Sequence, residues 1–294
     1  MNQDFRSSNR ALVARLRRAS GMSNHEVSGR SGKRLRRNSR KTNITMKDSK
    51  ISWTENSWNP WFGCTKVSPG CDNCYAKFLM QTLWKQVRWG RGKPRVRTTA
   101  DYWKQPLRWN QQAAEAGTST KVFCASLGDV FDTEVPRQWR DDLFALIRET
   151  PHLDWQLLTK RPGEAVKYAK KHPWPDNAWI GTSIEDQRRA VRAQIITGIP
   201  APVRFLSVEP LLGPVTLDLR GIDWVIVGGE SGPRHRPMKM EWARSVRDQC
   251  RAAGVAFFFN QWGGSTSEGG GHLLDGTVHH EFPVPKARQS LLAV

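Results

Sequence analysis

From residue 120 onward, short apolar runs alternate with segments of helical periodicity, and this alternation constrains the fold more than any other feature of the sequence. Six apolar runs make up the series: 121–126, 155–159, 178–183, 203–209, 223–228 and 255–260. Helical segments follow four of the runs, at 137–149, 163–171, 185–196 and 241–253, whereas no long helix is evident after 203–209. In the last helical segment Trp242, Val246 and Cys250 recur every four residues on one helix face, and Gly254 supplies a stop.

The apolar runs are continuous rather than alternating, which indicates strands that are buried on both faces, as in a parallel sheet. Upstream, we assign a first strand to 50–53 and its helix to 75–87. Strands that alternate with helices in this way predict an α/β fold, a complete or partial (β/α) barrel of six to seven parallel strands. A doubly wound open sheet is the alternative, because the same alternation also fits that topology.

The chain divides into a basic arm at 1–48, the barrel at 49–263, and a Gly-rich link with a tail at 264–294. Within the tail, Asp275-Gly276 is expected to form the turn of a small hairpin. The net charge of +19 is unevenly spread: residues 1–45 carry 12 Lys/Arg against 2 Asp/Glu, and the remainder contributes +9. The excess in the body of the chain favours a polyanionic partner such as nucleic acid.

The basic arm is rich in Ser, Asn and Arg and has no sustained apolar period, so we predict that it is disordered. Three interpretations stay open for it. Its segment 33–41 (KRLRRNSRK) contacts phosphates, or it is a solvated tail, or Met46 is the native start of the protein and the arm is a mis-assigned extension.

Composition also excludes several classes of protein. No stretch approaches the roughly 18–20 consecutive apolar residues that would span a bilayer, and the N-terminus has no apolar segment of the secretory type. Five cysteines, an odd number in a chain of 294 residues, do not indicate a disulfide framework. We therefore expect no membrane association and a location in the reducing cytoplasm.

Cys64, Cys71 and Cys74 lie within eleven residues with the spacing C-x6-C-x2-C, and Pro69 and Gly70 turn the backbone so that the thiols can converge. Thiolates are soft ligands that select zinc, copper(I) or iron–sulfur clusters. A structural zinc ion is almost always held by four ligands. Here the candidates for a fourth ligand are distant in sequence: His25, His152, Cys124 and Cys250. An iron–sulfur cluster is the favoured interpretation, zinc is the alternative, and three cysteines without a metal are the third.

The cysteine segment resembles the cluster motif of the spore-photoproduct-lyase-like branch of radical-SAM proteins. The matching residues are Asn59-Pro60, Gly63-Cys64, Gly70-Cys71 and Cys74-Tyr75-Ala76. The departure is the six residues between the first two cysteines, where that branch has a shorter spacing. The resemblance implies a radical-SAM-like barrel.

A closer resemblance is to a phage and bacterial three-Cys-motif family, named after phage gene products thirty-seven and sixty-eight, whose reaction is unsettled. It extends over about residues 50–285. The segments that carry it are ISWTE at 51–55, GDVFD at 128–132, LTKRP at 158–162, WIGTS at 179–183, SVEP at 207–210, GGESG at 228–232 and NQWG at 260–263.

These resemblances imply that the three cysteines bind a [4Fe–4S] cluster whose open iron binds S-adenosyl-L-methionine. Reductive cleavage of that cofactor would then yield a radical that removes a hydrogen atom from the substrate, so the cofactor carries the chemistry. They also imply a reducing partner such as a flavodoxin or ferredoxin, and a partner protein from the same operon.

Polar residues follow the apolar runs repeatedly, at the ends where functional side chains of parallel barrels gather. They are Ser126, Asp129, Thr159, Lys160, Arg161, Ser183, Glu185, Ser207, Glu209, Glu230, Ser231 and Gln261. Any single one also fits an ordinary helix cap or turn, but six such strand ends in a row favour one shared site, because buried polar groups are costly unless they are used.

By analogy with radical-SAM proteins, we assign cofactor binding to Asp129 for the amino group, Ser183 with Arg188 for the carboxylate, and Glu209 for the ribose hydroxyls. Gly228, Gly229 and Glu230 are expected to form a close-approach turn that lines the cofactor site. Substrate binding is assigned to four cations. Lys160 and Arg161 are expected to bind an anionic substrate or, alternatively, the cofactor carboxylate, and Arg234 and Arg236 are expected to bind phosphates. The catalytic residue is unknown.

Five tryptophans surround the cysteine segment: Trp53, Trp58, Trp61, Trp84 and Trp89. We expect at least half of them to pack in the core, and the others to shield the cluster or to stack on bases. The leading functional hypothesis is a radical-SAM enzyme, phage-related and acting on nucleic acid or a nucleotide-type substrate. The alternatives are a non-catalytic zinc-binding nucleic-acid-binding protein, and a cluster that serves as a redox sensor or scaffold.

Overall fold

Seven parallel strands form one sheet in which every strand pairs with the next sheet strand along the chain. The computed structural model describes residues 49, 51–266 and 270–286. The predictions for the basic arm at 1–48 therefore lie outside the described residues. The strands are β1 (Asn56–Ser57), β4 (Thr120–Cys124), β5 (Leu153–Thr159), β6 (Ala178–Ser183), β7 (Arg204–Val208), β8 (Trp224–Gly228) and β9 (Ala256–Gln261).

This strand order separates the two topologies that the sequence left open. A doubly wound sheet reverses its strand order at a switch point. Here the order β1-β4-β5-β6-β7-β8-β9 runs in one direction and β1 does not pair with β9, so the fold is a partial (β/α) barrel. Across the open side, Oγ of Ser52 donates a hydrogen bond of 2.7 Å to Oδ1 of Asn260, which joins the segment before β1 to β9. The predicted α/β barrel class is confirmed.

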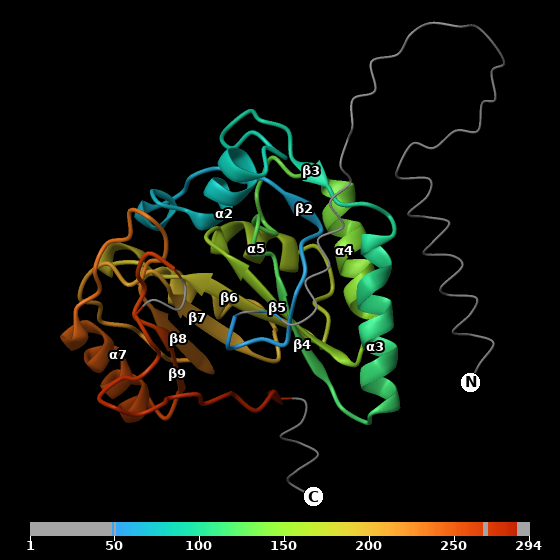
Figure 1. Cartoon of the computed structure of the whole chain (residues 1–294). Helices are drawn as coiled ribbons and strands as arrows, with labels where there is room; N and C mark the ends of the chain where they lie inside the picture. Colours follow the sequence, from blue (N-terminus) through green and yellow to red (C-terminus); the bar gives the residue numbers. More distant parts are fainter. Residues whose placement is uncertain (1–48, 50, 267–269, 287–294) are drawn as a thin grey trace, which may run out of the picture.

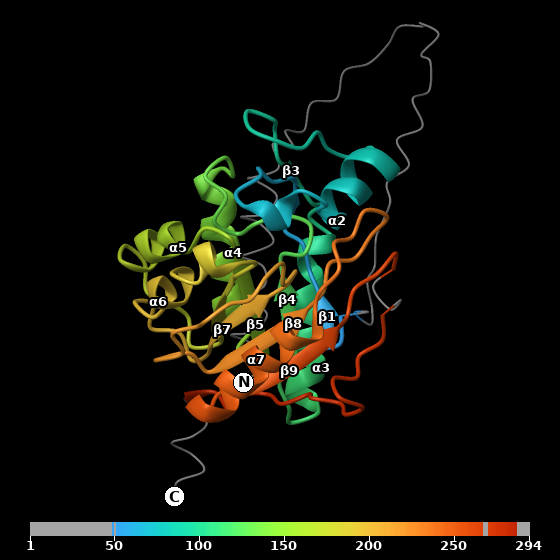
Figure 2. The same cartoon turned by 90° about the vertical axis from the view of Figure 1, so that its left-hand side faces the viewer.

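Helices α3 to α7 lie on the outside of this sheet, whereas α2 lies above the ends of the strands (Figures 1 and 2). They are α2 (Tyr75–Lys77), which continues into the π-type helix η2 (Phe78–Leu83), α3 (Gln105–Glu115), α4 (Arg137–Glu149), α5 (Pro162–Ala169), α6 (Arg192–Ile196) and α7 (Met240–Ala253). Short 3-10 helices are η1 (Pro69–Cys71), η3 (Tyr102–Lys104) and η4 (Gln187–Arg189). Helix α7 ends as predicted at Gly254, which adopts the left-handed conformation with φ of 65°.

The two faces of the sheet bury different side chains, because successive residues of a strand point to opposite faces. The outer face packs on the helices through residues such as Val122, Leu157 and Val225. The inner face carries an aromatic cluster, whose members are Trp53, Phe123, Trp179, Val203, Phe205, Trp224, Ile226 and Phe258. Gly181 is needed there, because a Cβ atom at that position would lie 2.3 Å from the ring of Phe205.

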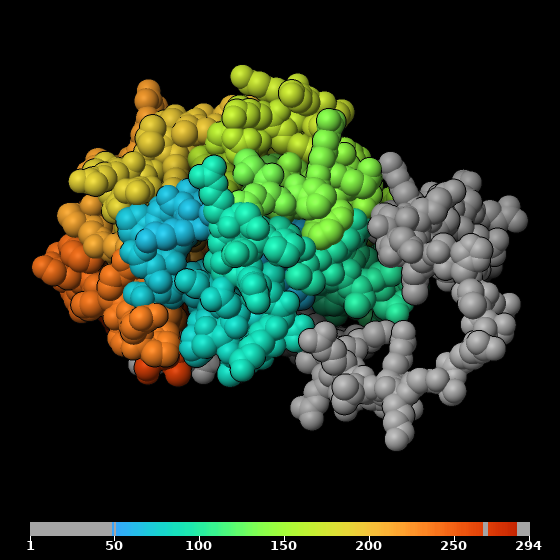
Figure 3. All heavy atoms as spheres, turned by 90° about the horizontal axis from the view of Figure 1, so that it is seen from above, coloured from blue at the N-terminus to red at the C-terminus, as the bar shows by residue number. Residues whose placement is uncertain are grey.

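Continuing along the inner face, the same two-residue period places Ser183, Ser207, Gly228 and Asn260 beyond the aromatic cluster, towards the carboxyl ends of the strands. The inner face is therefore closed by aromatic rings at one end and polar at the other. Figure 3 looks down on the polar end, where the blue and teal segment between β1 and α3 lies over the strands.

Some local predictions were wrong. The first strand is not at 50–53 but at Asn56–Ser57, and the helix expected over 185–196 is reduced to η4 and α6. Helix α3 and the small antiparallel sheet of β2 (Trp61–Phe62) and β3 (Val96–Arg97) were not predicted. The hairpin turn is confirmed: Leu274 pairs with Thr277, and Asp275 and Gly276 have φ of 55° and 74°. Among the described residues no helix is both long and apolar enough to cross a membrane.

Candidate functional site

The cysteine segment 64–74 leaves the β1 side of the sheet and lies over the carboxyl ends of the strands, where it is attached at three points. Cys64, Cys71 and Cys74 are all partly exposed. The other two cysteines differ: Cys124 and Cys250 are fully buried in the core between the sheet and the helices. Burial therefore separates three available thiols from two thiols that only fill the core.

Arg161, which follows β5, makes the first attachment. Its guanidinium donates to Oδ2 of Asp129 at 2.8 Å, to the carbonyl oxygen of Thr65 at 2.9 Å and to Sγ of Cys64 at 3.6 Å. Asp129 also accepts from Oγ1 of Thr159 at 2.7 Å and from the backbone nitrogen of Lys160 at 3.1 Å. The carboxyl ends of β4 and β5 thus hold one guanidinium directly against the first thiol.

Glu185, which follows β6, makes the second attachment. Its fully buried carboxylate accepts from Oγ of Ser68 at 2.6 Å and from Arg192 at 3.1 Å, and Nζ of Lys160 lies 3.6 Å away. Gly70 sits on the same carboxylate, because a Cβ atom there would lie 2.6 Å from Cγ of Glu185. The glycine before Cys71 is therefore required by this close approach.

Glu230, which follows β8, makes the third attachment through Arg236. Arg236 donates from Nε to Oε2 of Glu230 at 2.9 Å and from Nη2 to the carbonyl oxygen of Pro69 at 2.9 Å. Nδ2 of Asn73 donates to the same Glu230 oxygen at 3.0 Å. Burial acts to raise the pKa of Glu230, but the hydrogen bonds from Arg236 and Asn73 outweigh it, so the pKa is lowered and the carboxylate stays ionised.

Two of the three thiols, those of Cys64 and Cys74, are partly desolvated by the residues around them. Burial, together with the nearby carboxylate of Asp129, raises the pKa of Cys64 to about 12 against the opposing effect of Arg161. Burial also raises the pKa of Cys74. Because thiolates are the metal ligands, a bound metal would have to displace these protons.

No group of three or more His, Cys, Asp or Glu side chains within the described ranges is arranged to hold a single metal ion. A four-iron cluster is a larger body than one ion, so thiols that bind its separate irons need not converge on one point. The donor set is chemically suited to such a cluster, since three partly exposed thiols belong to one segment that is held at Thr65 and at Pro69.

Polar residues of β7, β8 and β9 meet beside this segment on the inner face. Oε1 of Glu209 accepts from Nδ2 of Asn260 at 2.6 Å, and Ser207 lies 3.3 Å from the other oxygen. Burial raises the pKa of Glu209, against the effect of these two partners. Gly228 leaves room for this carboxylate, because a Cβ atom there would lie 2.4 Å from Oε1 of Glu209.

The remaining predicted residues are distributed unevenly. Ser183 is buried at the end of β6, and its carbonyl oxygen accepts from Arg192. Gly229 makes the expected close approach, to the carbonyl of Trp262. Arg188 and Arg234 are exposed, and Arg234 reaches the cysteine segment only through its carbonyl oxygen, which accepts from Asn73. The cofactor and substrate roles assigned to these residues stay predictions.

Sequence reasoning assigned no role to several residues that hold the site together, namely Ser68, Asn73 and Arg192. Asn59 and Asn260 appear in the matching motifs, but no role was assigned to either. The amide of Asn59 accepts from the backbone nitrogen of Leu127 at 2.7 Å and donates to Oγ of Ser126 at 3.0 Å, and so fixes the start of the cysteine segment against the loop after β4. A usable signal was present, because an Asn directly before a Pro next to a cysteine cluster is typical of a turn with a side-chain hydrogen bond. The expectation that at least half of the five tryptophans pack in the core is confirmed, because Trp53, Trp58 and Trp61 are buried. Trp84 and Trp89 are not buried, and the role assigned to them stays a prediction.

Together, fold and site define an α/β partial-barrel protein whose three available thiols lie on one segment over the carboxyl ends of the strands. The chain belongs to the family described as "Protein of unknown function (DUF5131)", which matches residues 48–283. The resemblance to the family named after phage gene products stays a prediction. No curated protein matches the chain.

Solved structures of spore photoproduct lyase are similar to this chain. A double mutant with bound AdoMet and dinucleoside spore photoproduct has a TM-score of 0.45 and 14% identity, with 88% of this chain and 76% of that chain covered. A complex with dinucleoside spore photoproduct has a TM-score of 0.45 and 14% identity, covering 84% and 80%. A further mutant has a TM-score of 0.45 and 13% identity, covering 85% and 92%.

Proposed function

We propose that the protein is an iron–sulfur enzyme of the radical-SAM type, in which Cys64, Cys71 and Cys74 hold a [4Fe–4S] cluster and which acts on nucleic acid or a nucleotide-type substrate. The observation that carries the proposal is the difference in exposure between two groups of cysteines. Three are partly exposed on one fixed segment at the carboxyl ends of the strands, and the two others are buried in the helix-side core. Three cysteines leave one iron of such a cluster without a protein ligand, as chemistry on a bound molecule requires.

Among the described residues, the candidates that the sequence offered for a fourth ligand lie away from the cysteine segment. Cys124 and Cys250 are buried away from the segment, and His152 precedes β5 at the opposite ends of the strands. His25 lies outside the described residues. His235 is exposed on the loop that follows Glu230, and its Nδ1 is 3.0 Å from the carbonyl oxygen of Gly232. His235 is therefore the residue to test.

The protein's own part in the chemistry is to bind, orient and exclude water. When bound to a reduced cluster, S-adenosyl-L-methionine supplies the one-electron chemistry. Ser183, Glu209 and Gly228 stand at the polar end of the inner face and are the residues that we assign to holding this cofactor. The aromatic cluster behind them, with Trp179 and Trp224, closes that face against water. Lys160 and Arg161 place positive charge beside the thiols, where bound thiolates need compensation.

The experiment is anaerobic reconstitution of the full chain followed by reduction with dithionite in the presence of S-adenosyl-L-methionine. The expected result is a brown protein that releases 5′-deoxyadenosine and methionine, detected by chromatography and mass spectrometry. A colourless protein that contains zinc would overturn the proposal. So would a stable cluster that never cleaves the cofactor, which would make the site a redox sensor or scaffold.

A further inference from the structure

The stretch between η2 and β3 is strongly cationic. Residues 84–95 read WKQVRWGRGKPR and include five Lys or Arg residues but no carboxylate. This stretch lies next to the cysteine segment, because the backbone nitrogen of Gly90 donates to the carbonyl oxygen of Cys64 at 3.0 Å. Val87 and Trp89 also share a small hydrophobic cluster with Cys74 and Met80.

One of the five cations, Arg95, has a structural role, because it holds the backbone of the stretch in place. Arg95 is buried and bonds Oδ2 of Asp132 at 2.6 and 2.9 Å, and its other nitrogen donates to the carbonyl oxygens of Gly90 and Lys93 at 3.1 and 2.7 Å. Its charge is thus neutralised inside the fold. By contrast, the side chains of Lys85, Arg88 and Lys93 are exposed and form no ion pair with a carboxylate of the described residues.

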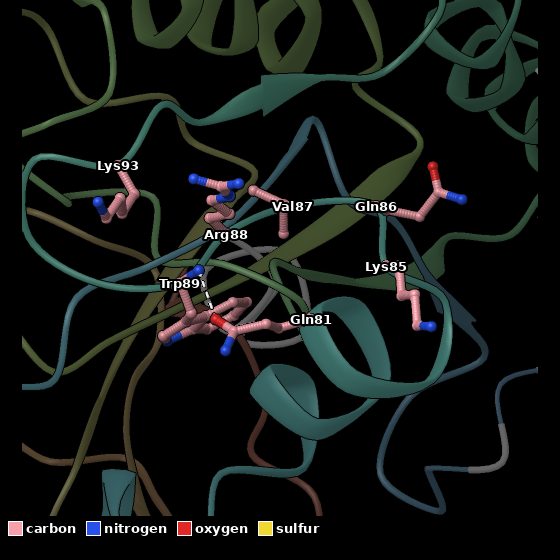
Figure 4. A pocket seen from close by; sticks show the side chains of 7 residues that line it. All are labelled: Gln81, Lys85, Gln86, Val87, Arg88, Trp89 and Lys93. Carbon is pink, nitrogen blue, oxygen red and sulfur yellow. Dashed lines mark hydrogen bonds between the residues drawn. The ribbon is translucent and has the colours of Figure 1, made fainter.

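These unpaired cations line a cavity of about 560 Å³ that is open to the surface. Its lining residues are Gln81, Lys85, Gln86, Val87, Arg88, Trp89 and Lys93, which Figure 4 draws as sticks. The backbone nitrogen of Trp89 donates to Oε1 of Gln81 at 2.7 Å, a hydrogen bond drawn as a dashed line in Figure 4. The cavity therefore combines positive charge, one aromatic ring and side-chain amides.

We propose that this cavity binds a segment of single-stranded nucleic acid, with phosphates on Lys85, Arg88 and Lys93 and a base stacked on Trp89. Cationic grooves with an aromatic platform are how proteins hold single strands, because every base has a face to stack and every link carries a charge. The volume lies within the range of sites for small ligands, enough for a nucleotide unit. An acidic peptide would satisfy the cations but would leave the ring without a partner.

Stacking on the ring of Trp89 selects single-stranded nucleic acid over a duplex. A base inside a duplex is already stacked on its neighbours, so only an unpaired or extruded base can lie on Trp89. The cavity adjoins the segment of Cys64, so the bound strand would lie close to the three thiols. That this strand is the substrate rests on the proposed function. Binding itself does not require the cluster, so the two can be tested separately.

The test is fluorescence anisotropy of a labelled 12-nucleotide DNA, and an RNA of the same sequence, with the full-length protein at several salt concentrations. The variant Lys85→Gln/Arg88→Gln/Lys93→Gln should weaken binding at least ten-fold and reduce the slope of log affinity against log salt by about 2, since each phosphate contact on a single strand contributes about 0.7. A matched control, Lys170→Gln/Lys171→Gln/Arg251→Gln, removes three exposed cations outside the cavity and should change affinity much less.

Trp89→Ala should weaken binding of the single strand about ten-fold. It should leave binding of inorganic polyphosphate unchanged, and Trp89→Phe should retain most of the affinity. Thermal unfolding checks that each variant folds; if Trp89→Ala does not, Trp89→Leu replaces it and the charge variant stands alone. The proposal is overturned if the charge variant binds like the parent chain, or if folded Trp89 variants lose nothing. It is also overturned if a duplex of equal length binds as tightly as the single strand.

Iron and sulfide content, measured on the same preparations, separates the two proposals. The charge variant Lys85→Gln/Arg88→Gln/Lys93→Gln should keep the iron–sulfur cluster of the parent chain, because these three side chains are exposed. If the protein binds the strand but holds no iron, the proposal for the cavity is supported and the proposed function is contradicted. If the protein holds the iron–sulfur cluster but does not bind the strand, the proposal for the cavity is contradicted and the cluster assignment is supported.

Discussion

The backbone of Gly70 lies directly against the side chain of Glu185, so that a Cβ atom at position 70 would be only 2.6 Å from Cγ of the glutamate. Glu185 is fully buried and is held by Ser68 and Arg192, so it cannot move aside without losing these partners. The second cysteine therefore has its position fixed by the end of β6.

This contact predicts that Gly70→Ala displaces the cysteine segment. Overpacking of this kind costs about 1–3 kcal/mol, and we expect a lower melting temperature together with a reduced iron content after reconstitution. Gly163→Ala is the matched control, because a Cβ atom at Gly163 meets nothing within 4 Å. An alanine at position 70 that leaves both quantities unchanged would show that the segment is not held by Glu185.

The pair of Glu230 and Arg236 predicts a pH-dependent effect. Because the pKa of Glu230 is lowered in the folded protein from its ordinary value of 4.5, its stabilising contribution is complete above that pH and is lost as the pH falls through the lowered value. Glu230→Gln should therefore cost about 2 kcal/mol of unfolding free energy at pH 7, less than a fully buried pair, because Arg236 is partly exposed. Denaturant titrations of both proteins at several pH values would measure this difference. A difference that stays constant down to pH 3 would contradict the assignment.

The guanidinium beside Cys64 predicts an electrostatic effect on the cluster. Arg161→Gln removes a positive charge that lies 3.6 Å from Sγ of Cys64. The loss of this charge disfavours the reduced state of the cluster, because that state is the more negative one. We expect a more negative midpoint potential in a redox titration followed by electron paramagnetic resonance. Arg188→Gln, an exposed change on η4, should leave the potential unaltered, so equal shifts in the two variants would rule out a local effect.

Strands β4 to β9 were predictable because they are largely buried on both faces and therefore appear in the sequence as continuous apolar runs. The prediction of a strand at 50–53 was wrong because Ile51 and Trp53 are apolar for another reason. Both pack on the aromatic cluster of the inner face from a segment that is not a strand. Helix α3 was missed because its buried face depends on Trp109 and Ala113, with polar residues at most other positions.

The thiols could be found from their spacing, whereas the residues that fix them could not. Asn73 and Glu230 are 157 positions apart, and no local period relates them. Gly70 was recognisable only as a turn residue, because its contact with Glu185 exists only once β6 and the cysteine segment are adjacent.

The most direct test of the account is the iron and labile sulfide content of anaerobically reconstituted single variants. Cys64→Ser, Cys71→Ser and Cys74→Ser should each lose the cluster. Cys124→Ser, Cys250→Ser and His235→Ala should keep about four irons and four sulfides per chain, as for a cubane cluster held by three cysteines. Loss of the metal in His235→Ala, or zinc in place of iron in the parent chain, would contradict the claim that three thiolates alone hold a cluster with an open iron.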